Sequence, residues 1–179
     1  MVRFSLAAVL VAAGVIAAMP ALGQQKRASD HETISGMVGD KKSGNRVTIT
    51  YGRPNAKGRQ IWGGLVPYGK AWRTGADEAT TLTTQQPIKI GNDTIPAGTY
   101  TLYTVPTDKD AKLAFSKKTG GWGIPVNEKE DLVRVDMKRE PLDKKVDQFT
   151  MAITGGATSG TIKMMWENAQ YSVEFANAK

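Results

Sequence analysis

The chain has 179 residues, and its 24 lysine and arginine residues against 17 aspartate and glutamate residues give a formal net charge of +7. It contains no cysteine and one histidine, which excludes thiol catalysis, disulfides and thiolate metal sites and leaves too few ligands for a transition-metal site. The basic residues are scattered in runs of two at most, so their pattern does not predict nucleic-acid binding.

The first 23 residues have the pattern of a secretory signal peptide. Arg3 precedes an apolar run from Phe4 to Ala18, and small residues stand three and one positions before the Gly23–Gln24 bond. An uncleaved anchor would need a longer run, because roughly 20 apolar residues span a bilayer. We therefore expect cleavage after Gly23, export to the periplasm or the medium, and no stable membrane anchor after processing.

Residues 24–45 are polar and predict a lead-in with a possible first strand around Thr33 to Val38. His31 lies in this lead-in, where we expect a solvated side chain and no catalytic role. Residues 46–179 have the length of a single domain.

Apolar and polar residues alternate from residue 46 onward. Val47, Ile49 and Tyr51 alternate with threonines, and the same spacing recurs at Val133, Val135 and Met137, at Phe149, Met151 and Ile153, at Ile162, Met164 and Trp166, and at Tyr171, Val173 and Phe175. Turn-forming residues separate these sets, for instance Glu167-Asn168-Ala169. Because no amphipathic helix lies between the strands, we predict an all-β fold, a jelly-roll-like antiparallel β-sandwich.

The stretch from Tyr51 to Thr80 interrupts this alternation with about 25 residues that show no periodicity. Its apolar and proline residues favour order over disorder, namely Pro54, Ile61, Trp62, Leu65, Pro67 and Trp72. We expect one long ordered loop across one end of the sandwich.

This loop concentrates arginine and aromatic side chains. Arginine forks bind carboxylates and other anions at two points, and aromatic faces stack on sugar rings. The candidate ligand-binding residues are Tyr51, Arg53, Arg59, Tyr68, Trp72, Arg73 and Glu78. They suit a carboxylated or acidic glycan, or a small anionic ligand. The alternative is scaffolding, in which the tryptophans belong to the core and the arginines bond to carboxylates or carbonyl groups.

No catalytic residue, cofactor or metal site is predicted. The sequence has no Gly-x-Ser-x-Gly motif, no phosphate-binding loop and no EF-hand spacing, although carboxylates at residues 127–131 leave calcium open. Asp77 and Glu78 would point to opposite faces if they entered a strand, so they do not predict a shared site. We expect one of them to pair with Arg53, Arg59 or Arg73.

The loop and its flanks resemble a family of secreted bacterial proteins known as domain of unknown function 2911. The matching residues are Tyr51, Arg53 and Pro54, Gly58 and Arg59, Gly63 to Pro67, Trp72 to Ala76, Glu78 to Thr80, Pro96 to Tyr100, and Trp166 with Glu167. The resemblance implies an all-β exported domain. It carries no established reaction, so it assigns no catalytic residue.

Three functions remain open at this point. The first is a non-catalytic envelope module that binds a ligand or partner through the loop. The second is a lyase or glycosidase for an acidic polysaccharide, in which an arginine neutralises a uronate and Tyr51 or Tyr68 acts as base or acid. The third is a structural envelope component that self-associates through a sheet edge. A deep polar pocket with two arginines and a tyrosine would favour the enzyme.

Overall fold

The computed structural model describes residues 26–178, so the predicted signal peptide lies outside the described residues. The described chain forms nine strands and one 3-10 helix, η1 (Glu128–Glu130). The strands are β1 (Asp30–Val38), β2 (Asn45–Arg53), β3 (Thr81–Thr84), β4 (Ile88–Ile90), β5 (Asp93–Ile95), β6 (Gly98–Pro106), β7 (Asp110–Ser116), β8 (Asp131–Gly155) and β9 (Ser159–Asn177). No helix within this range is long and apolar enough to cross a membrane.

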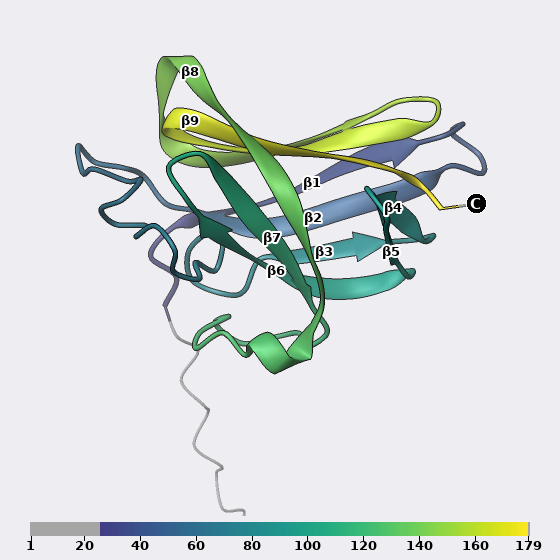
Figure 1. Ribbon diagram of the computed structural model, residues 1–179, viewed down its shortest axis with the longest axis horizontal. Helices are drawn as coiled ribbons and strands as arrows, with labels where there is room; N and C mark the ends of the chain where they lie inside the picture. The colour runs from purple at the N-terminus through teal and green to yellow at the C-terminus, as the bar shows by residue number, and fades with distance from the viewer. Residues whose placement is uncertain (1–25, 179) are drawn as a thin grey trace, which may run out of the picture.

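All nine strands join one open antiparallel sheet in the order β1-β2-β3-β6-β7-β8-β9-β4-β5. β1, β2 and β3 run across the view of Figure 1, and β7 and the first part of β8 cross them steeply. The prediction of an all-β antiparallel fold is confirmed. The strands that were expected to form the layers of a sandwich are all part of one continuous sheet.

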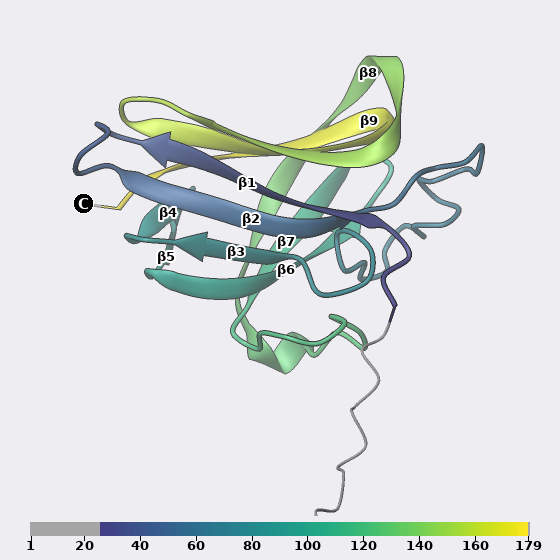
Figure 2. The ribbon, with the colours of Figure 1, turned by 180° about the vertical axis from the view of Figure 1, so that it is seen from behind.

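The sheet curls until β1 lies beside the β8–β9 hairpin, as both ribbon views show (Figures 1 and 2). The Gly39 amide donates to the Gly156 carbonyl oxygen across 2.9 Å. Gly155 lies so close to β1 that a side chain there would clash with the Met37 carbonyl oxygen. The free edge of β1 is thereby largely covered.

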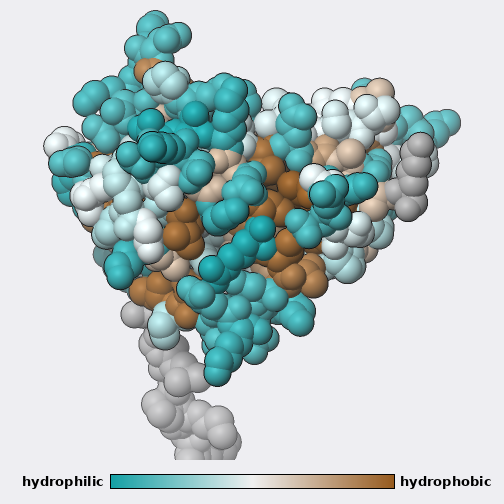
Figure 3. Space-filling model, viewed as in Figure 1, coloured by the Kyte–Doolittle hydropathy of each residue, from teal (hydrophilic) through white to brown (hydrophobic). Residues whose placement is uncertain are grey.

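Alternation along β2 builds one side of the core. Val47, Ile49 and Tyr51 are buried, whereas Thr48 and Thr50 between them are more exposed. This is the pattern of a strand with one buried face. On the face shown in Figure 3, hydrophobic residues gather beside the steep part of β8, and hydrophilic residues cover most of the rest.

The expected turn at Glu167-Asn168-Ala169 is wrong, because β9 runs straight through it. Glu167 has φ +52°, and the pairing of β8 with β9 shifts register at this point. Up to Trp166 the even-numbered residues face the core, and from Ala169 on the odd-numbered ones do. A bulge inserts one residue into the strand, so the alternation of buried and exposed residues changes phase there. In the sequence, this change of phase looks like the end of one strand and the start of another.

Candidate functional site

The long loop between β2 and β3, residues 54–80, extends from one end of the sheet (Figure 1). Two tryptophans fasten it to the core. The Trp62 indole N–H donates to the Trp166 carbonyl oxygen across 2.9 Å, and the backbones of Trp72 and Thr104 exchange two hydrogen bonds of 2.7 and 2.8 Å. The Trp72 ring stacks on that of Trp166 at 5.8 Å between centroids. The expected long ordered loop is confirmed, and these tryptophans are its anchors.

A concavity of about 400 Å³ lies between this loop and the residues that precede β1. We call it the loop concavity. Trp72 and Trp166 line it together with Leu65, whose side chain is unusually exposed for a leucine at 47%. The charged side chains in its lining are Lys57, Arg59 and Arg73, and no carboxylate from the described residues lines it. The concavity therefore combines apolar surface with an excess of positive charge.

Arg59 and Arg73 line the concavity, and each uses only part of its donors to bond the scaffold. Arg59 donates from Nε to the Ala56 carbonyl oxygen at 2.9 Å and from Nη2 to that of Asn55 at 2.7 Å. Arg73 donates from Nη1 to the carbonyl oxygens of Asp77 at 2.8 Å and Trp122 at 3.2 Å. Among residues 26–178, Nη1 of Arg59 and Nη2 of Arg73 have no hydrogen-bond acceptor. Both arginines are thus held in place with donors to spare.

Arg53 lies outside the loop concavity. It donates from Nε to the Phe149 carbonyl oxygen at 3.3 Å and from Nη2 to Thr150 Oγ1 at 3.0 Å, and its Nη1 lies 3.3 Å from a carboxylate oxygen of Glu32. With all three nitrogens engaged and the side chain 23% exposed, Arg53 ties β2 to β8 and β1.

Tyr51 is also absent from the concavity lining, because its side chain is 1% exposed within the core. Its hydroxyl group donates to the Glu32 carboxylate at 2.7 Å and accepts from the Met151 amide at 2.9 Å. Burial, reinforced by Glu32 and opposed by the Met151 amide, raises the pKa of Tyr51 from 10.0 to about 12. The hydroxyl group therefore stays protonated at neutral pH.

Tyr68 is 38% exposed and packs over Gly63 instead of lining the loop concavity. Gly63 has φ +77°, and a Cβ atom there would lie 2.9 Å from the Tyr68 ring. Both the backbone conformation and the ring contact favour glycine at this position.

Asp77 and Glu78 do not point to opposite faces, because they lie in a bend and not in a strand. Both approach Nε2 of His31, Asp77 at 3.3 Å and Glu78 at 3.2 Å. Glu78 also pairs with Arg27 at 2.8 Å. The expectation that one of these carboxylates pairs with Arg53, Arg59 or Arg73 is therefore wrong; Arg73 bonds only the carbonyl oxygen of Asp77.

The expectation of a solvated His31 is wrong as well, since its side chain is 14% exposed. Asp77 adopts φ +61°, and its carboxylate accepts from the amides of Ala28 and Ser29 at 3.1 and 2.9 Å. Burial opposes ionisation of Asp77, but these amides and His31 together outweigh it and lower its pKa. The cluster fastens the residues before β1 to the long loop.

A comparison with protein families matches residues 29–175 to the family described as a protein of unknown function, DUF2911. The chain belongs to this family. The match extends from the residues before β1 into β9 and includes the whole of the long loop. No curated protein and no solved structure matches the chain.

In this DUF2911 chain, several residues that carry the family resemblance have structural roles. Gly98 has φ +154°, and the Tyr100 hydroxyl group donates to the Pro96 carbonyl oxygen at 2.9 Å. Gly75 has φ +156°, and a Cβ atom there would lie 2.9 Å from the Gly52 carbonyl oxygen. Gly75 thus allows the long loop to approach β2 closely, and Gly98 begins β6.

Sequence reasoning placed Arg59, Trp72 and Arg73 among the site residues, and the structure brings these three together in the loop concavity. It missed Lys57 and Leu65, which line the same concavity. The available sign that they belong to the site was their position in the non-periodic loop. In a strand, a charged residue would lie on the polar face and an apolar residue on the buried face, but this loop has no such faces.

Proposed function

We propose that this protein is an exported, non-catalytic module of the cell envelope that binds an acidic glycan, or a smaller carboxylated ligand, in the loop concavity. The observation that carries the proposal is the set of three cationic side chains, Lys57, Arg59 and Arg73, in a lining without a carboxylate from the described residues. Such an excess of positive charge attracts anionic groups.

The chemistry of the lining suits a sugar acid. The unused N–H groups of Arg59 and Arg73 provide directional donors for a carboxylate, and Lys57 adds a third positive charge. Trp72 and Leu65 give apolar surface against which the carbon face of a sugar ring packs. The volume of about 400 Å³ falls within the range of small-molecule sites, roughly 300–1,000 Å³.

The two alternatives find less support. A lyase or glycosidase would use Tyr51 or Tyr68 as base or acid, but neither tyrosine lines the loop concavity, and the Tyr51 hydroxyl group is committed to Glu32. Self-association through a sheet edge would use β1 or β5. β1 is covered by the β8–β9 hairpin, and β5 has three residues.

Calorimetric titration of the purified protein with oligogalacturonate, a polyuronate, tests the proposal against a neutral oligosaccharide of equal length. We expect saturable binding of the polyuronate, weakened by salt, and none of the neutral sugar. Lys57→Gln removes a charge from the lining and should weaken binding about three-fold or more. Lys70→Gln is the matched control, because Lys70 is exposed in the same loop but does not line the concavity.

Two results would reject the proposal. One is the absence of saturable binding by any acidic oligosaccharide or short uronate. The other is an affinity that Lys57→Gln and Lys70→Gln leave equal, since binding would then not involve the loop concavity.

A further inference from the structure

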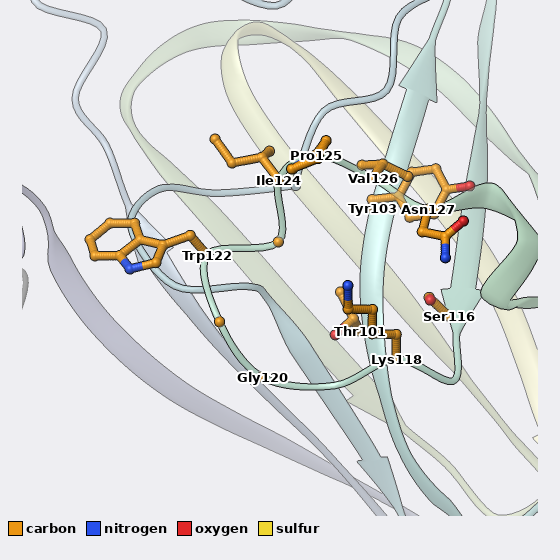
Figure 4. A pocket seen from close by; sticks show the side chains of 12 residues that line it. Thr101, Tyr103, Ser116, Lys118, Gly120, Trp122, Ile124, Pro125, Val126 and Asn127 are labelled. Carbon is orange, nitrogen blue, oxygen red and sulfur yellow. The ribbon is translucent and has the colours of Figure 1, made fainter.

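A second, smaller cavity of about 140 Å³ lies on the outer face of β6 and β7 (Figure 4). We call it the β6–β7 pocket. Tyr100 and Leu102 of β6 face the core, so Thr101 and Tyr103 point to the opposite side of the sheet. They are nevertheless buried, because the segment between β7 and η1, residues 117–127, covers this face.

The floor of the pocket carries a buried hydroxyl group without a partner. Thr101 is 6% exposed, and its Oγ1 atom makes no hydrogen bond within residues 26–178. Next to it, Ser116 is 5% exposed and reaches only the Glu130 carbonyl oxygen, at 3.5 Å. Figure 4 shows both residues on the strand side of the cavity. A buried hydroxyl group without a partner is costly, which favours a polar occupant beside Thr101.

The rim supplies further donors. Lys118 contributes an ammonium group, and Asn127 points its side-chain amide into the cavity toward Ser116 (Figure 4). The Oδ1 atom of Asn127 already accepts from the Lys129 amide at 3.3 Å, which leaves its NH₂ group to donate. No carboxylate among the described residues lines the pocket.

One wall of the pocket is apolar. It consists of the Tyr103 ring with Pro125 and Val126. The Tyr103 hydroxyl group itself is engaged, since it donates to Asp131 and accepts from Arg134 at 2.7 Å. Its ring therefore offers an apolar surface to an occupant, and its polar end is not free to bind one.

We propose that the β6–β7 pocket binds a small hydroxycarboxylate of about six non-hydrogen atoms, because a cavity of ~150 Å³ holds a molecule of benzene size. The carboxylate meets Lys118 and Asn127, the hydroxyl group meets Thr101 and Ser116, and the carbon skeleton lies against the Tyr103 ring. This site is distinct from the loop concavity, with which it shares no lining residue, and it does not depend on the function proposed for that concavity.

The test is a titration of the ¹⁵N-labelled protein with sodium lactate, followed by NMR. We expect saturable shifts at the amides of Thr101, Ser116 and Asn127. Lactamide has the size of lactate without its charge, and propane-1,2-diol has its hydroxyl group without the carboxylate. Both should bind about ten-fold more weakly or worse, because the charge-assisted hydrogen bonds to the rim are lost.

Two variants locate the binding, each with its own control. Lys118→Gln should weaken lactate binding about ten-fold, whereas Lys117→Gln, one residue away and outside the lining, should leave it unchanged. Thr101→Val keeps the side-chain shape and should weaken binding several-fold. It should not lower the urea midpoint, because the removed hydroxyl group has no protein partner within the described chain.

The proposal is overturned if lactate causes no saturable shift, in which case water satisfies Thr101. It is also overturned if the shifts cluster at Lys57, Arg59 and Arg73, or if lactamide and propane-1,2-diol bind as tightly as lactate. Equal lactate affinity in Lys118→Gln, Thr101→Val and the unchanged protein would overturn it too, with the folded state of each variant verified from its own spectrum.

Discussion

Arg73 donates a hydrogen bond to the carbonyl oxygen of Trp122 across 3.2 Å, and its guanidinium group lies 5.9 Å from the centre of the Trp122 ring. This contact joins the long loop to the segment between β7 and η1. Arg73 lines the loop concavity, and Trp122 lines the β6–β7 pocket. One arginine therefore positions the walls of two separate cavities in addition to placing a charge in one of them.

Arg73→Ala should lower the free energy of unfolding by about 2 kcal/mol, because it leaves the carbonyl oxygens of Asp77 and Trp122 without their donor. Arg59→Ala should cost about 1 kcal/mol or less, since its acceptors, Ala56 and Asn55, belong to the same stretch of loop. Urea unfolding followed by tryptophan fluorescence measures both. An Arg59→Ala loss equal to that of Arg73→Ala would contradict the linking role of Arg73.

Tyr51 should make the protein sensitive to alkaline pH. Its pKa in the folded state is about 12, against 10.0 for an unperturbed tyrosine, so between these values the folded chain holds a proton that the unfolded chain releases. The free energy of unfolding then falls as pH rises through this window, and the contribution is fully present below about pH 10.

Tyr51→Phe should flatten this alkaline slope and lower stability at pH 7 by about 1–3 kcal/mol, because the Met151 amide loses its acceptor. Tyr68→Phe is the control, since Tyr68 is exposed and should leave both quantities unchanged. Urea midpoints measured from pH 8 upward compare the variants. The explanation fails if both variants follow the same alkaline slope as the unchanged protein.

Asp77 should act in the opposite pH range. Its folded-state pKa is lowered from 3.8, so its contribution to stability is present above that value and is lost as pH falls through the lowered pKa. Asp77→Asn suits the positive φ of this position and should lower the free energy of unfolding at pH 7 by about 1–3 kcal/mol. It should also weaken the acid dependence below about pH 4.

Asp93→Asn provides the comparison for Asp77→Asn, because Asp93 is exposed and its side chain makes no hydrogen bond within the described part of the chain. Acid titration of the circular dichroism signal in moderate urea measures both variants. Identical acid midpoints for the two would show that the amides of Ala28 and Ser29 do not stabilise the Asp77 carboxylate.

Export is tested by the mass of the processed protein. We expect the chain recovered from the producing cells to begin at Gln24, because small residues precede the Gly23–Gln24 bond at the positions that signal peptidase recognises. Gly23→Leu should block this cleavage and leave a heavier product. An exported chain that retains residues 1–23 would contradict the leader prediction.

The sequence predicted those parts of the fold that depend on local periodicity. Val47, Ile49 and Tyr51 identify β2 because a strand with one buried face alternates regardless of what it packs against. The long loop was recognisable because its residues follow neither the alternation of a strand nor the periodicity of an amphipathic helix. Arg59, Trp72 and Arg73 could be selected as site residues because they combine charge and aromatic surface within that loop.

Other features depend on contacts between distant segments, which local periodicity does not report. His31 meets Asp77 only because β1 pairs with β2 and the long loop bends back beside them. Thr101 is buried on the outer face of β6 only because residues 117–127 cover it. The bulge at Glu167 changes the phase of alternation along β9, so the sequence of this one strand has the pattern of two strands. The alternation along the sequence indicates which residues are buried. Tertiary packing decides which segments bury them, and therefore which polar groups meet in a pocket.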